Sequence, residues 1–196
     1  MSRLRTAILI SGRGSNMQAI LEAAQNPSYA AEPVLVLSNN PSAKGLEIAT
    51  SMGIATDAVD HKAFGKDREA FEHALQDVLE RHCVEMIVLA GFMRILTPWF
   101  VGRWDQRMIN IHPSLLPKYP GLNTHQRAID AGDEEAGCSV HWVTEGVDEG
   151  AVIMQARVPV LPEDTSESLE ARVLPQEHVL YPKAVNLAAQ EILERT

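Results

Sequence analysis

The sequence predicts an α/β fold of the Rossmann-like class, with a mostly parallel central sheet, helices on both faces, and an antiparallel extension in the C-terminal half. Three short, nearly all-apolar runs, at residues 4–10, 34–37 and 86–90, are typical of parallel strands buried on both faces. Helical patterns separate these runs, and alternation of strand and helix indicates a parallel sheet. Residues 137–143 and 152–160 are expected to form two later strands joined by a Gly-rich turn.

Two helices are expected between the first three strands. Ser15 and Gln18 match a capping box, which would open a helix at the end of the first strand's loop. Asp67 can cap the second helix. Its apolar residues recur every three or four positions and form one stripe: Phe71, Leu75, Val78 and Leu79.

The second half contains a further strand that ends in a proline-rich loop. Residues 108–112 have the apolar pattern of a strand, and Pro113 ends it because proline cannot donate to a sheet ladder. Residues 114–121 include two more prolines and are the best candidate for a long functional loop. No internal repeat and no linker divides the chain, so residues 1–196 are expected to form a single domain.

Two helices are expected after this loop. Residues 124–130 favour a short helix, and residues 165–194 favour a long one. The long helix includes Pro175 and Pro182. A proline inside a helix costs ~3 kcal/mol or more, so we expect a kink or a break there.

Composition and charge exclude several classes of function. Lys and Arg number 17 and Asp and Glu number 26, a formal net charge of −9, which disfavours binding to nucleic-acid backbones. Cys83 and Cys138 are far apart in sequence, and two reduced core thiols are the expected state. No signal-peptide pattern and no apolar run of membrane-spanning length occurs, so a soluble, cytoplasmic protein is expected.

Gly12, Gly14 and Ser15 lie where the first strand passes into the first helix. Glycines let the backbone approach a ligand closely, and a helix N-terminus offers free N–H groups and partial positive charge. These features fit a phosphate cradle. An ordinary tight turn with Ser15 as a helix cap accounts for them equally well, since the segment matches neither GxGxxG nor a Walker loop.

Asn110 and His112 project from the same side of the predicted strand, because side chains alternate along a strand. Both lie near the carboxyl end of the strand, the edge where open α/β sheets bind ligands. An amide and an imidazole there suit oxyanion stabilisation and proton transfer. Taken alone, Asn110 is better explained as a hydrogen-bond partner of the loop backbone, and His112 as a core histidine. Asp148 can orient a histidine, but it is more typical of a solvated turn.

The segment 91–96 directly follows an apolar strand. Apolar side chains exposed there suit a flat ring bound against the backbone, although Phe92 and Ile95 individually are more typical of a continuing core. Arg68 and Arg94 can hold an anionic group, but such residues are usually solvated surface. No HExxH, CxxC or Gly-x-Ser-x-Gly pattern occurs, so neither a metal site nor an activated serine is expected.

Five segments together recur in the order typical of one enzyme family. They are Gly12-x-Gly14-Ser15-Asn16, Ala90-Gly91-Phe92-Met93-Arg94-Ile95-Leu96, Asn110-Ile111-His112-Pro113-Ser114-Leu115-Leu116-Pro117, Gly137-x-Ser139-Val140-His141, and Asp148. On these residues the chain resembles the folate-dependent formyltransferase family over essentially its whole length. Residues 118–122 and 176–178 resemble one branch of it in particular, the phosphoribosylglycinamide formyltransferases (glycinamide ribonucleotide transformylases) of purine biosynthesis.

The resemblance implies transfer of a formyl group from 10-formyltetrahydrofolate, a co-substrate, to the primary amine of glycinamide ribonucleotide, without a metal. It implies Asn110, His112 and Asp148 as the catalytic residues. The implied substrate-binding positions are Gly14, Ser15, Asn16 and Glu177. Small molecules would then be the partners, with no nucleic acid and no membrane, and the oligomeric state stays open.

The implied folate-binding positions lie on a helix, a strand and two loops. Arg68 matches a position near the glutamate tail of the folate, and the others would surround the pterin ring: Met93, Arg94, Ile95, Leu96, Asn110, Val143, Thr144, Glu145, Gly146 and Val147. The single formyltransferase domain, 1–196, would then divide into a phosphate-binding half, 1–100, and a folate-binding and catalytic half, 101–196.

Two residues depart from the family pattern. Asn123 stands where a histidine is frequent, and Pro175 directly precedes Gln176.

Three other functions compete with glycinamide ribonucleotide formylation. An aminoacyl-tRNA formyltransferase needs an RNA-binding domain and a basic surface, which this length and charge do not favour. A formyl-folate hydrolase is expected to carry a regulatory domain. A non-catalytic Rossmann nucleotide-binding module is expected to show GxGxxG and an acidic residue, for which Glu32 is the nearest candidate.

Overall fold

The computed structural model describes residues 3–195 and contains one seven-stranded sheet. Its strands are β1 Leu4–Ile10, β2 Ala31–Ser38, β3 Thr56–Ala58, β4 Met86–Leu89, β5 Met108–His112, β6 Glu135–Trp142 and β7 Val152–Pro159. The strand order is β3-β2-β1-β4-β5-β6-β7. The first five strands in this order are parallel, and β6 and β7 add antiparallel pairs. The predicted fold class is therefore confirmed.

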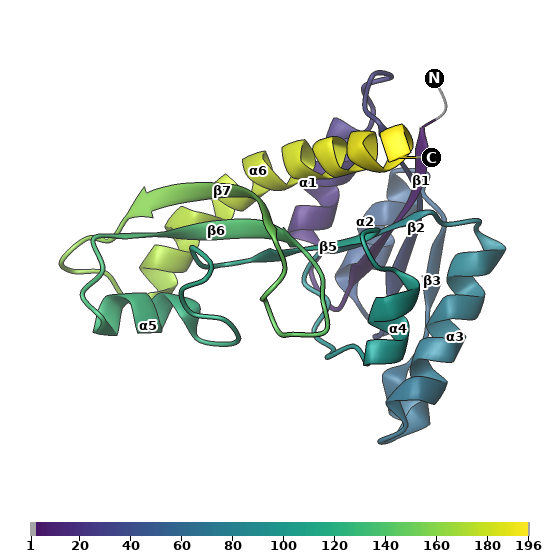
Figure 1. The fold of residues 1–196 in the computed structure, drawn as a ribbon, viewed down its shortest axis with the longest axis horizontal. Coiled ribbons are helices and arrows are strands. Elements are labelled where there is room, and N and C mark those ends of the chain that lie inside the picture. The colour runs from purple at the N-terminus through teal and green to yellow at the C-terminus, as the bar shows by residue number, and fades with distance from the viewer. Residues whose placement is uncertain (1–2, 196) are drawn as a thin grey trace.

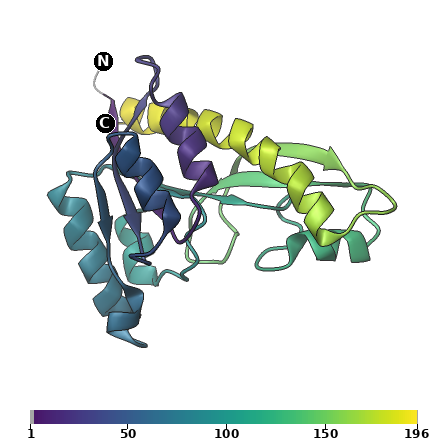
Figure 2. The same cartoon turned by 180° about the vertical axis from the view of Figure 1, so that it is seen from behind.

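Helices cover both faces of the sheet. They are α1 Ser15–Ala23, α2 Lys44–Ser51, the 3-10 helix η1 His61–Phe64, α3 Arg68–Arg81, α4 Pro98–Arg103, α5 Thr124–Asp130 and α6 Ser166–Arg195. Figure 1 shows α3 and α4 in front of the parallel strands, and Figure 2 shows α1 and α2 on the opposite face. The long α6 lies along the same face as α1, against which it packs.

Alternation along the central strands divides the core into two layers. In β1, Ile8 and Ile10 pack with α1 and α6, whereas Ala7 and Leu9 pack with α3 and α4. These side chains are all fully buried. A strand buried on both faces cannot expose a polar side, which explains why β1 is apolar from Ala7 to Ile10.

The starts of α1 and α3 differ in how they are capped. Asp67 caps α3 as predicted, since its Oδ1 accepts a hydrogen bond from Ala70 N at 3.0 Å. The capping box predicted at Ser15 is wrong. Gly14 occupies the N-cap position in the left-handed conformation, with φ 75°, so Ser15 is already the first helical residue and no side chain caps the helix. The loop needs a residue in the left-handed conformation at this position, which glycine adopts without strain, and this need outweighs the capping preference of Ser15.

The C-terminal helix α6 continues through both of its prolines without a break, and Figure 1 shows that its axis bends, so the expected kink or break takes the form of a bend. Packing holds the helix together at Pro182. Tyr181 beside it is completely buried and donates its hydroxyl to Leu89 O at 2.7 Å. Tyr29 donates to the carbonyl of Pro182 at 2.7 Å. These contacts offset the ~3 kcal/mol cost of an interior proline.

Three short elements and one thiol differ from expectation. β3, α2 and α4 were not predicted. Cys138 is buried, as expected of a core thiol, but Cys83 is exposed, and both are free. Cys83 lies in the turn after α3 with φ 49°, beyond the apolar stripe of that helix. Within residues 3–195, no helix is both long enough and apolar enough to cross a membrane.

Candidate active site

The loops that follow β1 and β4 meet at the carboxyl edge of the sheet. These strands are neighbours, yet the chain leaves β1 toward β2 on one side and later returns through β4 on the other. Such a switch point is where open α/β sheets bind ligands. Ser11 N donates to Gly91 O at 3.1 Å, and Met93 N donates to Ser11 Oγ at 2.7 Å. Hydrogen bonds therefore join the two loops.

The three predicted catalytic residues lie together beside this switch point. Asn110 and His112 stand at the carboxyl end of β5, and Asp148 reaches them from the loop between β6 and β7. Asp148 Oδ2 lies 3.3 Å from His112 Nδ1, and the two side chains are 11% and 7% exposed. Asp148 adopts φ 56°, a conformation that Asp tolerates better than most residues.

His141 belongs to the same cluster, and the sequence reasoning did not propose it as a site residue. It lies opposite Asn110 in the β5–β6 pairing. Its Nε2 is 3.3 Å from Asn110 Nδ2 and 3.5 Å from Asp148 Oδ1. Its Nδ1 lies 3.0 Å from the carbonyl of Trp142, which only accepts, so Nδ1 carries a proton. Nε2 thus faces both the amide of Asn110 and the carboxylate of Asp148, and one N–H of the Asn110 amide stays available.

The electrostatics of the cluster favour an ionised Asp148. Burial raises the pKa of this carboxyl, but hydrogen bonds from His141 and from the backbone N–H of Gly121 outweigh burial, together with the charges of the two histidines. The net result is a pKa below the ordinary value. The Gly121 N–H lies 2.9 Å from Asp148 Oδ2.

Both ring nitrogens of His112 face hydrogen-bond acceptors. Nε2 lies 2.8 Å from the carbonyl oxygen of Tyr119, so it must carry a proton. Nδ1 faces the carboxylate of Asp148. The doubly protonated imidazolium satisfies both contacts, whereas a neutral ring would turn a lone pair toward one acceptor.

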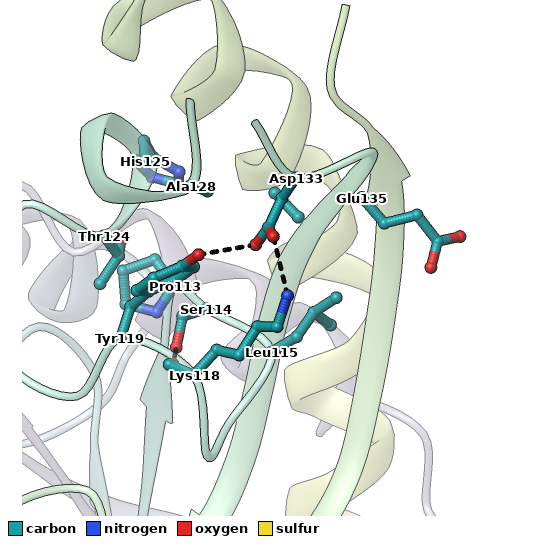
Figure 3. Close-up of a pocket in the computed structure, with 11 residues that line it drawn as sticks. Pro113, Ser114, Leu115, Lys118, Tyr119, Thr124, His125, Ala128, Asp133 and Glu135 are labelled. Carbon is teal, nitrogen blue, oxygen red and sulfur yellow. Dashed lines mark hydrogen bonds and ion pairs between the residues drawn. The ribbon is translucent and has the colours of Figure 1, made fainter. Parts of the chain in front are cut away.

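A pair of side chains holds the loop that carries Tyr119. Figure 3 shows Lys118 and Tyr119 both reaching Asp133, at 2.8 Å each. These bonds hold the pKa of Asp133 below its ordinary value. The cavity behind the loop measures about 10 Å³. That is room for one water at most, so the substrates must bind elsewhere.

The predicted phosphate cradle places Gly14, Ser15 and Asn16 at the N-terminus of α1. Asn16 Nδ2 donates to Glu177 Oε2 of α6 at 2.7 Å, so two residues predicted to bind the same substrate are in contact. Burial raises the pKa of Glu177, and the bond from Asn16 lowers it only in part. A carboxyl that gains a proton more readily repels a neighbouring anion less.

The segment after β4 presents two apolar side chains to solvent. Met93 is 72% and Ile95 68% exposed, whereas Phe92 is buried. The core assignment for Phe92 is confirmed, and the one for Ile95 is wrong. Within residues 3–195, the backbone N–H and C=O groups of Arg94, Ile95 and Leu96 make no hydrogen bond. An apolar surface beside free donors and acceptors suits the edge of a planar heterocycle.

The remaining predicted folate-binding residues come from the loop after β6 and from the start of α3. Val143 and Leu96 pack against the same apolar cluster. From Val143 the chain runs through Thr144, Glu145 and Gly146 to Val147, which is 56% exposed, and then to Asp148. Arg68 is exposed at the first turn of α3. One turn further, Glu72 accepts a hydrogen bond from Thr97 N at 2.7 Å, which joins this end of α3 to the segment after β4.

The site geometry and the fold can be compared with known proteins. The family model described as formyl transferase matches residues 4–185. The crystal structure of phosphoribosylglycinamide formyltransferase from Brucella melitensis superimposes with a TM-score of 0.91, at 50% identity, and covers 96% of each chain. The chain therefore belongs to the formyl transferase family, and within it to the phosphoribosylglycinamide formyltransferases.

Curated relatives include both separate enzymes and larger proteins. Phosphoribosylglycinamide formyltransferase of Escherichia coli is 47% identical over 183 residues, which cover 93% of this chain and 86% of that enzyme. The trifunctional purine biosynthetic protein adenosine-3 of Drosophila melanogaster is 48% identical over 185 residues. This chain spans only 14% of the length of that protein. Among residues 3–195, no group of three or more His, Cys, Asp or Glu side chains is arranged to hold a metal ion.

Proposed function

We propose that this chain transfers the formyl group of 10-formyltetrahydrofolate to the primary amine of glycinamide ribonucleotide in de novo purine biosynthesis. Membership of the family supports formyl transfer. The observation that carries the finer proposal is the cluster of Asn110, His112 and Asp148. It lies beside the switch point of the sheet, where the loops after β1 and β4 meet.

In this proposal the N-terminus of α1 holds the phosphate of glycinamide ribonucleotide. The N–H groups of Gly14, Ser15 and Asn16 and the helix dipole favour an anion there. Glu177 lies beside Asn16 and is suited to accept a hydroxyl of the ribose. This local set of donors compensates for the net charge of −9, which would otherwise repel an anionic substrate.

The backbone conformation of Gly14 makes a sharp test of this cradle. An added Cβ would stand 3.0 Å from Gly45 Cα and 3.1 Å from Met17 Cε, at φ +75°. We expect Gly14→Ala to raise the KM for glycinamide ribonucleotide about tenfold and to leave folate binding within about twofold. Gly53→Ala is the matched control, because Gly53 has φ +79° with open space around it. Equal substrate KM values in wild type and Gly14→Ala would contradict the cradle.

The pterin ring is proposed to lie against the segment Met93 to Leu96. The free backbone groups of Arg94, Ile95 and Leu96 can pair with the edge of the ring, and Met93 and Ile95 supply apolar contact. Asn110 and the loop residues Val143, Thr144, Glu145, Gly146 and Val147 would enclose the ring. Arg68 is proposed to bind a carboxylate of the glutamate tail.

The proposed chemistry begins with attack of the neutral amine on the formyl carbon. A nitrogen–carbon bond forms, and the carbonyl oxygen becomes an oxyanion. Asn110 donates its free N–H to this oxygen, and His112 supplies a second, positively charged donor. Losing one such donor typically costs ~2.7–4 kcal/mol of transition-state stabilisation. Asp148 keeps the imidazolium charged because an adjacent carboxylate favours the cation.

One proton must then move from the attacking nitrogen to the leaving folate nitrogen as the old carbon–nitrogen bond breaks. We propose that Asp148 assists this relay, directly or through a water. The carbonyl of Tyr119 occupies the space at His112 Nε2 that an oxyanion would need. This contact must give way when substrate binds, as catalytic hydrogen bonds often form fully only in the reactive complex.

The proposed partners are small molecules alone, and all of residues 1–196 are proposed to form one formyltransferase domain. Residues 1–100 supply the phosphate cradle, and residues 101–196 supply the catalytic cluster. The folate site draws on both halves, because Arg68 and Met93 belong to the first and Val143 to the second. None of the proposed steps requires a metal ion, and they use only side chains and backbone donors of this chain. A cytoplasmic location is part of the proposal.

A transfer assay with and without the amine acceptor tests the function. We expect tetrahydrofolate to form only when glycinamide ribonucleotide is present, in equal amount to the formylated product. Release of formate without the amine would indicate a hydrolase instead. Binding of NAD without any binding of folate would favour a nucleotide-binding module.

A further inference from the structure

Glu72 is a buried carboxylate that the proposed mechanism does not use. Its residue is 1% exposed, on the face of α3 that packs against the sheet and α4. Among residues 3–195, no Lys, Arg or His forms an ion pair with it. Burying a carboxylate without a cation is costly unless hydrogen bonds replace its hydration. Its hydrogen-bond partners therefore reveal what it holds in place.

Within residues 3–195, both hydrogen bonds to the Glu72 carboxylate come from Thr97. The backbone N–H of Thr97 donates to Oε1 at 2.7 Å, and its hydroxyl donates to Oε2. Thr97 is the N-cap residue of α4, yet it makes no side-chain capping bond. Capping by threonine typically contributes ~1 kcal/mol to a helix. The hydroxyl is thus used to fix Thr97 to Glu72 instead of capping its own helix.

Thr97 ends the segment that presents free backbone to the proposed pterin ring. The other end is held by Ser11, whose Oγ accepts from Met93 N at 2.7 Å and donates to Asn39 Oδ1 at 2.5 Å. Asn39 is itself 4% exposed. Between these two anchors, Arg94, Ile95 and Leu96 have no regular secondary structure, and their backbone groups make no hydrogen bond. The conformation of the segment therefore depends on its anchored ends.

We propose that Glu72 is a positioning residue for the folate, which acts by fixing Thr97 and thereby the unpaired backbone of Arg94 to Leu96. The inference rests on the proposed function, because it assumes that this backbone binds the pterin ring. Free backbone groups recognise a heterocycle only when they hold the correct spacing before binding, since ordering them afterwards reduces affinity. The phosphate cradle lies on α1 and α6, which cover the opposite face of the sheet from α3 (Figures 1 and 2).

Glu72→Leu makes the test, since leucine fills similar volume without an acceptor. The substitution leaves the Thr97 N–H and hydroxyl without their acceptor, so the variant is expected to unfold at a somewhat lower temperature than wild type and to stay folded at the assay temperature. We expect its Kd for tetrahydrofolate, measured by calorimetry, to rise about tenfold, while the Kd for glycinamide ribonucleotide stays within about twofold. A residue needed only for stability would not give this combination.

Matched variants complete the experiment. Glu72→Gln keeps an acceptor for the Thr97 N–H, and its amide can donate to the hydroxyl, so it is expected to restore near wild-type binding. Asp77→Leu makes the same exchange on the exposed face of α3 and should change neither affinity. If Glu72→Leu does not fold, Thr97→Val carries the test, with an expected loss of about fivefold in folate affinity.

Three results would count against the proposal. Folate binding within twofold of wild type in folded Glu72→Leu would overturn it, and so would a parallel loss of affinity for glycinamide ribonucleotide. A wild-type chain that binds no tetrahydrofolate would overturn the proposed function itself. The first two results would overturn the role of Glu72 and leave the proposed function intact. Failure of the Glu72 proposal can therefore be distinguished from failure of the proposed function.

Discussion

Replacing His112 with alanine is expected to lower kcat by about two to three orders of magnitude while the chain stays folded. Both ring nitrogens of His112 are directed at acceptors, Asp148 on one side and the carbonyl of Tyr119 on the other. The change removes the charged donor to the oxyanion and also the group that Asp148 supports. The KM for either substrate should change far less than kcat, because the lost interaction forms mainly in the transition state.

A control histidine separates this loss from general damage. His82 lies at the C-terminal end of α3, where its carbonyl accepts from Arg5 near the start of β1, at the opposite edge of the sheet from the cluster. We expect His82→Ala to retain near wild-type kcat, and circular dichroism to show a folded chain for both variants. A His112→Ala enzyme with kcat within tenfold of wild type would show that His112 is not the oxyanion donor.

Replacing Asp148 with asparagine is expected to remove most turnover and to move the alkaline limb of the pH–rate profile to lower pH. In the proposed mechanism, the alkaline limb reports loss of the His112 charge that supports the oxyanion. Without the carboxylate beside it, the imidazolium is less stable and loses its proton earlier. Asparagine tolerates the left-handed backbone at this position, with φ 56°, so the substitution tests charge and not strain.

The acid limb should behave differently. The pKa of Asp148 is held below its ordinary value, so this carboxyl is ionised well before the amine of the substrate loses its proton. The acid limb is therefore set by the amine and should stay in place in Asp148→Asn. Single-turnover rates across pH measure both limbs. Because the cluster titrates as a unit, apparent values belong to the cluster. An unmoved alkaline limb would indicate a neutral His112 acting as a base, with Asn110 alone holding the oxyanion.

Stability gives an independent check on the same residue. Folding lowers the pKa of this carboxyl, so its ionised form stabilises the native state at every pH above the pKa that it has in the unfolded chain. This stabilisation is lost as the pH falls through the pKa of the folded state. Wild type should therefore be more stable than Asp148→Asn at neutral pH. The difference in unfolding free energy should shrink below about pH 4. A difference that is independent of pH would contradict an ionised Asp148.

The fold was predictable where apolar runs were long and buried on both sides. β1 matches its prediction at both ends, Leu4 and Ile10. β3 could not be found, because its three residues are only half-buried and lie at the sheet edge. α2 gave no start signal, since Ala43 occupies its N-cap and offers no capping oxygen. The helix α6 bends without breaking, because packing around Tyr181 outweighs the local cost of its prolines.

Along β5, alternation placed Asn110 and His112 on the same side of the strand, and the family resemblance then marked both as catalytic. His141 was missed for a different reason. Its signal was its place in the predicted strand β6, but its role depends on the register of β6 against β5, which fixes it opposite Asn110. Periodicity within a strand does not determine register between strands. Tyr119 was equally beyond reach, because its backbone carbonyl and not its side chain contacts His112.

The hydroxyl of Ser11 has a consequence for how the two substrates are expected to bind. It belongs to the loop of the phosphate cradle, yet it holds the backbone of Met93 in the loop proposed for the pterin ring. A ligand that orders one loop therefore also orders the other, and the second ligand meets a smaller loss of conformational entropy. Linkage makes such cooperativity reciprocal, so each substrate is expected to strengthen binding of the other by the same factor.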